Sequence, residues 1–155
     1  MAGSEESLDV GPDGTLWIGA TDPADGRVCG LRLARFDGAD WDVWGRDDGI
    51  PDVGSVFWYG GCQEGIHTVA PDGSVWLAPL DFLAGRECSG VANFDGTTWT
   101  RHLPGLCVYD AAIAPDGTVW LQAGEVNSDV DGEPWYDFDP VGTYVITPEA
   151  AAGGE

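Results

Sequence analysis

The stretch Val10-Gly-Pro-Asp-Gly-Thr-Leu-Trp17-Ile-Gly-Ala20 occurs in this chain in three closely similar copies. The second copy is Val69-Ala-Pro-Asp-Gly-Ser-Val-Trp76-Leu-Ala78, and the third is Ile113-Ala-Pro-Asp-Gly-Thr-Val-Trp120-Leu-Gln122. Each copy reads apolar, small, Pro, Asp, Gly, Ser or Thr, aliphatic, Trp, aliphatic. An ordered pattern of this length that recurs along the chain is typical of a repeat architecture.

A second motif follows the first two copies. It is Leu33-Ala-Arg-Phe36-Asp-Gly-Ala-Asp-Trp41 in the first repeat and Val91-Ala-Asn-Phe94-Asp-Gly-Thr-Thr-Trp99 in the second. An extended run, an Asp-Gly turn and a second extended run predict a β-hairpin. Asp and Gly also supply the positive φ angles of a tight primed turn. Two hairpins in each repeat predict a four-stranded antiparallel meander.

The repeats place the expected strands along the chain. In the first repeat we expect strands near 7–12, 15–20, 29–36 and 40–45, and in the second near 65–71, 74–79, 88–94 and 98–103. The third repeat offers 107–115, 118–123 and 142–147, and its fourth strand is missing. Residues 55–59 are expected to extend the start of the second repeat or to form an edge strand. The chain is therefore predicted to be one domain, 1–155, with blades near 7–45, 55–103 and 107–147 and a flexible tail at 148–155.

The arrangement of these sheets follows from what they must bury. A single four-stranded sheet cannot cover both of its faces, whereas sheets stacked radially around an axis cover one another. The predicted fold is therefore all-β, a partial β-propeller of about three antiparallel blades with the Trp of each repeat between neighbouring blades. A β-sandwich-like stack of the same hairpins is the alternative, because a repeat period does not fix how sheets close.

Composition disfavours several kinds of partner. The chain has 155 residues, 27 acidic and 6 basic, and a formal net charge of −21. This charge repels nucleic acid and anionic membrane surfaces, and no apolar run approaches the ~20 residues of a membrane span. We therefore expect a neutral or cationic ligand or protein as partner, although surface acids also serve solubility. The acidic start, 1–7, does not resemble a signal peptide, which predicts either a cytoplasmic chain or part of a larger exported protein.

The cysteines follow the repeat. Two of them precede the Phe-Asp-Gly motifs and two precede the Pro-Asp-Gly motifs, at nearly equal spacings: Cys29 and Cys88, then Cys62 and Cys107. We expect all of them at the end of the sheets opposite the Asp-Gly turns. Repeat symmetry favours the pairs Cys29–Cys62 and Cys88–Cys107, each joining one blade to the next, among the three connectivities that four cysteines allow. Such bridges imply an oxidising compartment; free buried thiols or a zinc site are the alternatives.

Long irregular connections are expected at this same end, at 20–28, 45–61, 80–87 and 124–141. Loops on a rigid scaffold commonly carry binding sites. The candidate ligand-binding residues are the aromatic side chains of these loops: Phe82, Trp135, Tyr136 and Phe138. Alternatively, these aromatic side chains cover the core of an incomplete ring.

The acidic run Asn127-Ser-Asp129-Val-Asp131-Gly132 resembles the first half of a calcium-binding loop. Oxygen ligands at alternate positions and a Gly at the turn suit a hard cation. The last position of such a loop is Phe138 here and not Glu. Calcium, held by Asn127, Asp129 and Asp131, is the only cofactor that the sequence suggests, and a solvated turn is the alternative.

The stretch from Asp13 to Gly19, together with Gly30-Leu31 and Arg35-Phe36-Asp37-Gly38, resembles the two-component-regulator type of propeller repeat. The second repeat departs from that pattern at Ala78 and Asn93, and the third resembles only its first half. The resemblance implies a sensor or binding platform, of a kind found in exported or periplasmic regions of bacterial proteins, without a common catalytic set. Propellers have four or more blades, so this chain is a fragment, an open arc, or a unit that completes a ring by oligomerising.

The leading functional prediction is a non-enzymatic binding or sensor module, a propeller segment of a bacterial surface or periplasmic protein. The first alternative is a structural, self-associating propeller fragment. The second is a metal-dependent propeller lyase or lactonase, for which His67 and His102 are the available histidines. Neither histidine lies in a triad, metal-binding or nucleophile-elbow motif, and the sequence therefore predicts no enzyme.

Overall fold

The computed structural model describes residues 7–22, 30–50, 57–58, 61–62, 66–78, 88, 90–127 and 137–148. Within these residues the chain forms antiparallel β-sheets and one short 3-10 turn, η1 (Arg46–Asp48). The all-β prediction is confirmed for this part of the chain.

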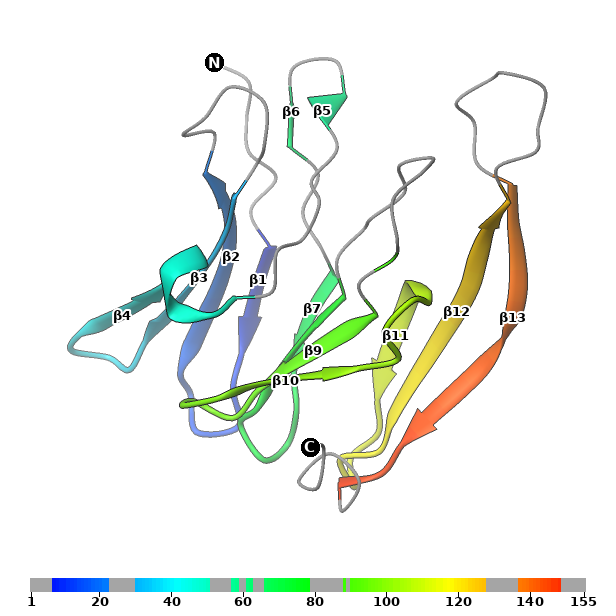
Figure 1. Ribbon diagram of the computed structural model, residues 1–155. Helices are drawn as coiled ribbons and strands as arrows, with labels where there is room; N and C mark the ends of the chain where they lie inside the picture. The colour runs from blue at the N-terminus through cyan, green and yellow to red at the C-terminus, as the bar shows by residue number, and fades with distance from the viewer. Residues whose placement is uncertain are drawn as a thin grey trace.

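Three sheets follow one another along the sequence (Figure 1). The first sheet has the order β1-β2-β3-β4: Ser7–Val10, Leu16–Asp22, Gly30–Phe36 and Trp41–Trp44. The middle sheet contains β7 to β10 in chain order: Ile66–Val69, Val75–Ala78, Val91–Phe94 and Trp99–His102. The third sheet has the order β11-β12-β13: Cys107–Ile113, Val119–Asn127 and Asp137–Ile146. The four-stranded meanders predicted for the first two repeats are confirmed.

The strands differ from the sequence prediction in two places. Of residues 55–59 the structure describes Phe57–Trp58, which form β5 and pair with β6 (Gly61–Cys62) in a separate two-stranded sheet, and β5 is not a strand of the middle sheet. The strands β12 and β13 are also longer than expected, since their pairing continues to Asn127 and Asp137. The irregular connection expected at 124–141 is therefore partly strand.

The Pro-Asp-Gly turns are not the primed turns that Asp-Gly suggested. In the first turn the Gly14 N–H donates to the Gly11 carbonyl at 2.9 Å, and the Gly11 N–H donates to the Thr15 carbonyl at 2.8 Å. Gly14 has a φ of +84°, while Asp13 does not have a positive φ. This is a type I turn followed by a glycine bulge. A primed turn is excluded because Pro12 holds its own φ near −65°.

The Phe-Asp-Gly turns, in contrast, have their Gly as the first of two central residues. The Asp37 N–H donates to the Asp40 carbonyl at 3.3 Å, and Gly38 between them has a φ of +103°. A positive φ at Gly38 and not at Ala39 matches the φ signs of a type II′ turn, and the Asp40 N–H donates to Asp37 Oδ1 at 2.9 Å. The equivalent turn of the middle sheet has the same bond, from the Asp95 N–H to the Thr98 carbonyl.

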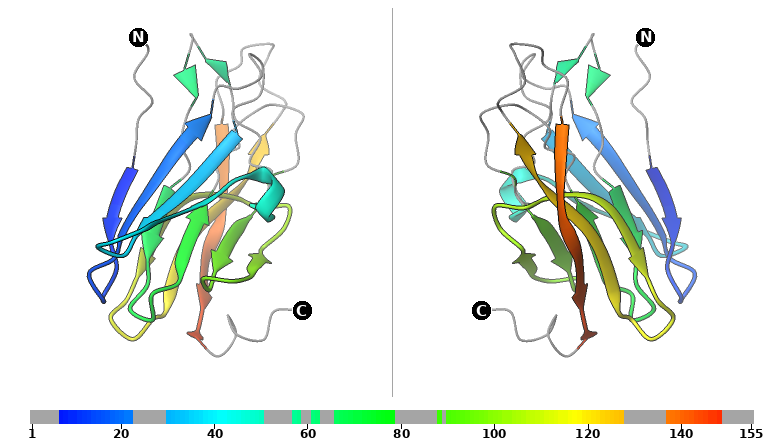
Figure 2. Two further views of the ribbon diagram at one scale, coloured as in Figure 1. Left: turned by 90° about the vertical axis from the view of Figure 1, so that its left-hand side faces the viewer. Right: turned by 90° about the vertical axis from the view of Figure 1, so that its right-hand side faces the viewer.

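The three sheets stand side by side, with their first strands as neighbours: β1 lies against β7, and β7 against β11 (Figure 1). A carboxylate joins the first two sheets, because Asp9 Oδ2 accepts a hydrogen bond of 2.8 Å from the Val69 N–H. Among the described strands no sheet closes on itself. The array therefore ends in a sheet on each side, and Figure 2 shows these two end sheets from outside.

Apolar clusters pack against both faces of the middle sheet. One apolar cluster lies between the first and middle sheets: Trp17, Leu33, Val75, Leu77 and Phe94, with Ile50 beside them. A second cluster lies between the middle and third sheets: Ala70, Trp76, Val91, Val108, Val119, Leu121, Ala123 and Ile146. All four residues of β9 are buried as a result.

Candidate functional site

Each sheet has two different faces, which the strand registers define. One face carries the Trp of the repeat and is called here the Trp face. In the first sheet its central row is Asp9, Trp17, Arg35 and Asp42. The opposite face carries rows of aliphatic and aromatic side chains and is called the apolar face. In the middle sheet its central row is Val69, Val75, Phe94 and Trp99.

We call the contact between two neighbouring sheets a junction. At the first junction, the Trp face of the first sheet packs on the apolar face of the middle sheet. Trp17 is 3% exposed, and its ring meets Phe94 edge-on with ring centroids 6.5 Å apart. Trp44 stacks on Trp17 at 5.7 Å and also meets Phe94, at 5.0 Å. Phe94 is thus the centre of the surface that receives the tryptophans of the preceding repeat.

The second junction repeats this arrangement one sheet further on. Trp76, at the position equivalent to Trp17, is 3% exposed and packs in one cluster with Val119 and Leu121. These two residues are equivalent to Val75 and Leu77, which receive Trp17 at the first junction. Every described junction between neighbouring sheets therefore joins a Trp face to an apolar face.

The apolar face of the first sheet takes part in neither of the described junctions. It consists of two complete rows across the sheet: Val10, Leu16, Phe36 and Trp41, then Leu8, Ile18, Ala34 and Val43. We call these eight residues the Phe36 face. The exposed fractions of its outer members are 63% for Leu8, 57% for Val10, 51% for Trp41 and 55% for Val43. A continuous apolar surface on the open side of a sheet is a feature of interaction sites.

The Phe36 face is even more apolar than its buried counterpart in the middle sheet. Leu8 and Val43 lie at the two ends of their row, where the middle sheet has His67 and Arg101. An antiparallel sheet with one face in water normally carries polar residues on that face. The sequence of the first repeat therefore departs from the repeat pattern in the direction that favours burial.

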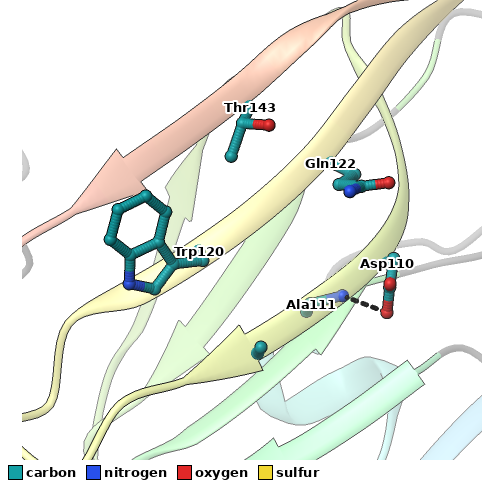
Figure 3. Close-up of a pocket in the computed structure, with 6 residues that line it drawn as sticks. Asp110, Ala111, Trp120, Gln122 and Thr143 are labelled. Atoms are coloured by element: carbon teal, nitrogen blue, oxygen red, sulfur yellow. Dashed lines mark hydrogen bonds between the residues drawn. The ribbon is translucent and has the colours of Figure 1, made fainter.

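The Trp face of the third sheet is the other open surface. By register it consists of two rows, Ala112, Trp120 and Val145, then Asp110, Gln122 and Thr143, and we call it the Trp120 face. Trp120 is 48% exposed and Val145 47% exposed. Figure 3 shows Trp120 beside Thr143, Gln122 and Asp110, which line a shallow pocket of about 220 Å³ together with Ala111 and Ala112.

Sequence reasoning expected the repeat Trp to pack between blades, and did not single out these faces. Trp120 occupies the same repeat position as Trp76, so no local signal marks it as exposed. For the Phe36 face one signal was present, because Leu8 and Val43 are apolar where the second repeat is polar.

The predicted disulfide between Cys88 and Cys107 is borne out. Their Cα atoms are 4.9 Å apart and the two sulfur atoms are bonded. Cys88 precedes β9 and Cys107 begins β11, so the bridge joins the middle sheet to the third. Two backbone hydrogen bonds flank it, from the Gly105 N–H to the Cys88 carbonyl at 2.9 Å and from the Gly90 N–H to the Leu106 carbonyl at 3.1 Å.

Most of the other candidate site residues lie outside the described part of the chain. These are Phe82, Trp135, Tyr136, Asp129, Asp131 and Cys29. Only the backbone is described for Asn127, Phe138 and Cys62, which belong to β12, β13 and β6. The calcium ligands, the aromatic loop residues and the pair Cys29–Cys62 stay predictions.

Several turn carboxylates have a local structural role. Asp37 Oδ1 accepts from the N–H groups of Asp40 and Ala39, both at 2.9 Å, and these bonds lower the pKa of Asp37. Hydrogen bonds to Thr15 lower the pKa of Asp13, and hydrogen bonds to Thr118 lower that of Asp116. The Asp-Gly acids thus hold the turns, as local Asx hydrogen bonds do elsewhere.

His102 lies at the second junction. Its ring stacks on Trp76 with centroids 5.2 Å apart, and burial lowers its pKa. Only the backbone of His67 is described, in β7. Among the described residues, no group of three or more His, Cys, Asp or Glu side chains is placed to hold a metal ion.

No helix of the described residues is long and apolar enough to cross a membrane. Comparison of the chain with protein-family models, with curated proteins and with solved structures gives no match.

Proposed function

We propose that this chain is a segment of a β-propeller that acts as a non-enzymatic binding module, and that it binds through the Phe36 face and the Trp120 face. The propeller assignment is supported by three sheets in chain order, each with its first strand beside the first strand of the next. It is also supported by the two successive junctions, which join equivalent faces. The resemblance of the repeats to those of two-component-regulator propellers points the same way.

The observation that carries the binding role is the exposure of the Phe36 face. Its eight residues are all apolar, and four of them are more than half exposed. Covering one large aliphatic or aromatic side chain contributes about 1.5–3 kcal/mol. A partner that covers this face therefore gains a large part of its binding free energy from the apolar rows.

The cellular location is part of the proposal. A disulfide between Cys88 and Cys107 is stable in an oxidising compartment and rare in a reducing cytoplasm. The bridge supports an exported location, and with the resemblance of the repeats we propose an extracellular or periplasmic region of a larger bacterial protein.

Binding of the fluorescent apolar dye bis-ANS tests the role of the Phe36 face. The measurement uses a Trp120→Asp variant, in which the Trp120 face is blocked and the Phe36 face is left open. We expect this variant to bind the dye in its native state, and the added substitution Val43→Asp to weaken binding several-fold. Val43 is 55% exposed, so the change places a charge on the face without opening the core.

The matched control adds the same charge elsewhere. Thr97 lies exposed in the turn between β9 and β10 and belongs to neither open face, and Thr97→Asp should leave dye binding unchanged. Circular dichroism checks that all variants are folded. Equal dye binding with and without Val43→Asp would contradict the proposal.

A further inference from the structure

We infer that the partner of both open faces is a second copy of this chain, docked head to tail, with the Trp120 face of one copy on the Phe36 face of the other. The inference rests on the proposed function and names its partner. Both junctions within the described chain join a Trp face to an apolar face. The two open faces are one of each kind, so together they can form a third junction of the same type.

The pairing of faces within the chain sets the rule. The Trp face of the first sheet, with Trp17, meets the row of Val75 and Phe94 in the middle sheet. The Trp face of the middle sheet, with Trp76, meets the row of the third sheet that contains Val119. The described junctions always join a Trp face to an apolar face. A copy of the chain is therefore a partner that carries the surface each open face needs.

The receiving surface is already arranged for this contact. Phe36 and Trp41 stack with ring centroids 4.9 Å apart and an interplanar angle of 30°. The equivalent pair of the middle sheet, Phe94 and Trp99, stacks at 4.6 Å and 23°. Since Phe94 receives Trp17 at the first junction, we expect Phe36 to receive Trp120 of the second copy, with little rearrangement on binding.

Head-to-tail docking also covers the Trp120 face and the Phe36 face of each copy at the same time. Each copy has one Trp120 face and one Phe36 face, so two copies related by a twofold axis form two identical junctions. Three sheets from each copy make six, within the 4–8 blades that propellers have. If the rotation does not close after two copies, the same contact leads to a larger ring or an open chain.

Charge predicts how this association responds to salt. Each copy has a net charge of −21, so two copies repel at low ionic strength. Salt screens that repulsion over about 8 Å at 0.15 M and leaves apolar contacts intact. Association should therefore strengthen as sodium chloride is raised, whereas an interface held by ion pairs would weaken.

Light scattering over a series of concentrations measures the association. The wild type should reach at least twice the 16.4 kDa of one chain. Trp120→Asp alone and Val43→Asp alone should each leave a folded monomer, because every junction contains one face of each kind. The Thr97→Asp control should associate like the wild type.

Mixing the two variants tests the head-to-tail geometry. One intact junction remains possible in the mixture, between the Trp120 face of the Val43→Asp chain and the Phe36 face of the Trp120→Asp chain. A heterodimer that forms only on mixing supports the inference. If Trp120→Asp alone still dimerises while Val43→Asp does not, like faces pair and the inference is overturned.

A wild type that stays monomeric at all concentrations and salt levels also overturns the inference. In that case the dye measurement separates the two proposals. If Val43→Asp abolishes dye binding, the Phe36 face binds a partner other than a second copy. If Val43→Asp leaves dye binding unchanged, the proposed binding function is contradicted as well.

Discussion

Trp76 and Trp120 occupy the same position of the same repeat, and their surroundings differ. Both follow a Pro-Asp-Gly turn, and each lies on the second strand of its sheet, between two antiparallel neighbours. Trp76 is 3% exposed because the third sheet covers it, whereas Trp120 is 48% exposed because no further sheet follows in the described chain. The comparison teaches that a Trp in this repeat is a contact for the next sheet, and that its burial depends on that sheet being present.

The apolar faces of the middle and first sheets show the same contrast between a covered and an exposed surface. Phe94 of the middle sheet is 1% exposed under Trp17, while Phe36 of the first sheet lies on a face whose outer residues are exposed. The middle sheet thus shows what the repeat does when both neighbours are present. The end sheets show which faces are exposed when one neighbouring sheet is absent from the described array.

The largest expected effect comes from truncating the two tryptophans. Trp76→Ala should lower the free energy of unfolding by about 3–5 kcal/mol, since it empties a packed junction. Trp120→Ala should lower that of the monomer by about 1 kcal/mol or less, because half of its side chain is already in water. Urea unfolding of dilute protein, followed by circular dichroism, measures both. Equal losses would mean that Trp120 is also covered within one chain.

Removal of the Cys88–Cys107 bridge tests the junction between the middle and third sheets. The two cysteines are 19 residues apart, and replacing both by Ser should cost about 3 kcal/mol through the larger entropy of the unfolded chain. Reductant added to the wild type should reproduce the loss in urea unfolding, and should have no effect on the double variant. A wild type insensitive to reductant would argue against the bridge.

The junction between the first and middle sheets depends on a different link. Asp9→Ala removes the acceptor of the Val69 N–H and should cost about 1–2 kcal/mol. Asp9→Asn keeps an acceptor oxygen and should cost less. Hydrogen exchange of the Val69 amide, measured by NMR, should accelerate in the Ala variant and much less in the Asn variant. Unchanged exchange in both would show that this bond does not hold the two sheets together.

The smallest effect concerns the pH dependence of the second junction. Burial lowers the pKa of His102 in the folded chain, so the unfolded chain binds the proton more tightly. The corresponding stability is present above the ordinary histidine pKa and is lost as pH falls through the folded pKa. Thermal unfolding between about pH 7 and 5 should show this loss, and His102→Phe, which keeps a ring against Trp76, should reduce it. An NMR titration in which His102 has an ordinary or raised pKa would contradict the prediction.

Much of the local structure could be predicted from the sequence because its causes are local. The Asp-Gly turns and the alternation of side chains between them predict the hairpins and their order. The Cys88–Cys107 pair followed from repeat symmetry, because equivalent positions lie at the same end of neighbouring sheets. The turn type was predicted wrongly at Pro12, where the fixed φ of proline outweighs the preference of Asp-Gly for a primed turn.

The candidate site was mostly missed for a physical reason. A strand pattern states which residues share a face, as it does for Leu8, Ile18, Ala34 and Val43. It does not state what lies against that face, because packing partners are distant in sequence. The predictions therefore concentrated on loops, and the two open sheet faces appeared only when the sheets were placed side by side.

The sequence by itself determined the repeat, the hairpins and the assignment of each side chain to one of two faces, since these depend on turn chemistry and on the two-residue period of a strand. Only the tertiary structure decided which of those faces is buried. Burial is a property of neighbours, so identical repeat positions become core at Trp76 and surface at Trp120. The same physical reason leaves the apolar and aromatic faces exposed at the ends of the described array, and not at its centre, which is why we propose the ends as the binding surfaces.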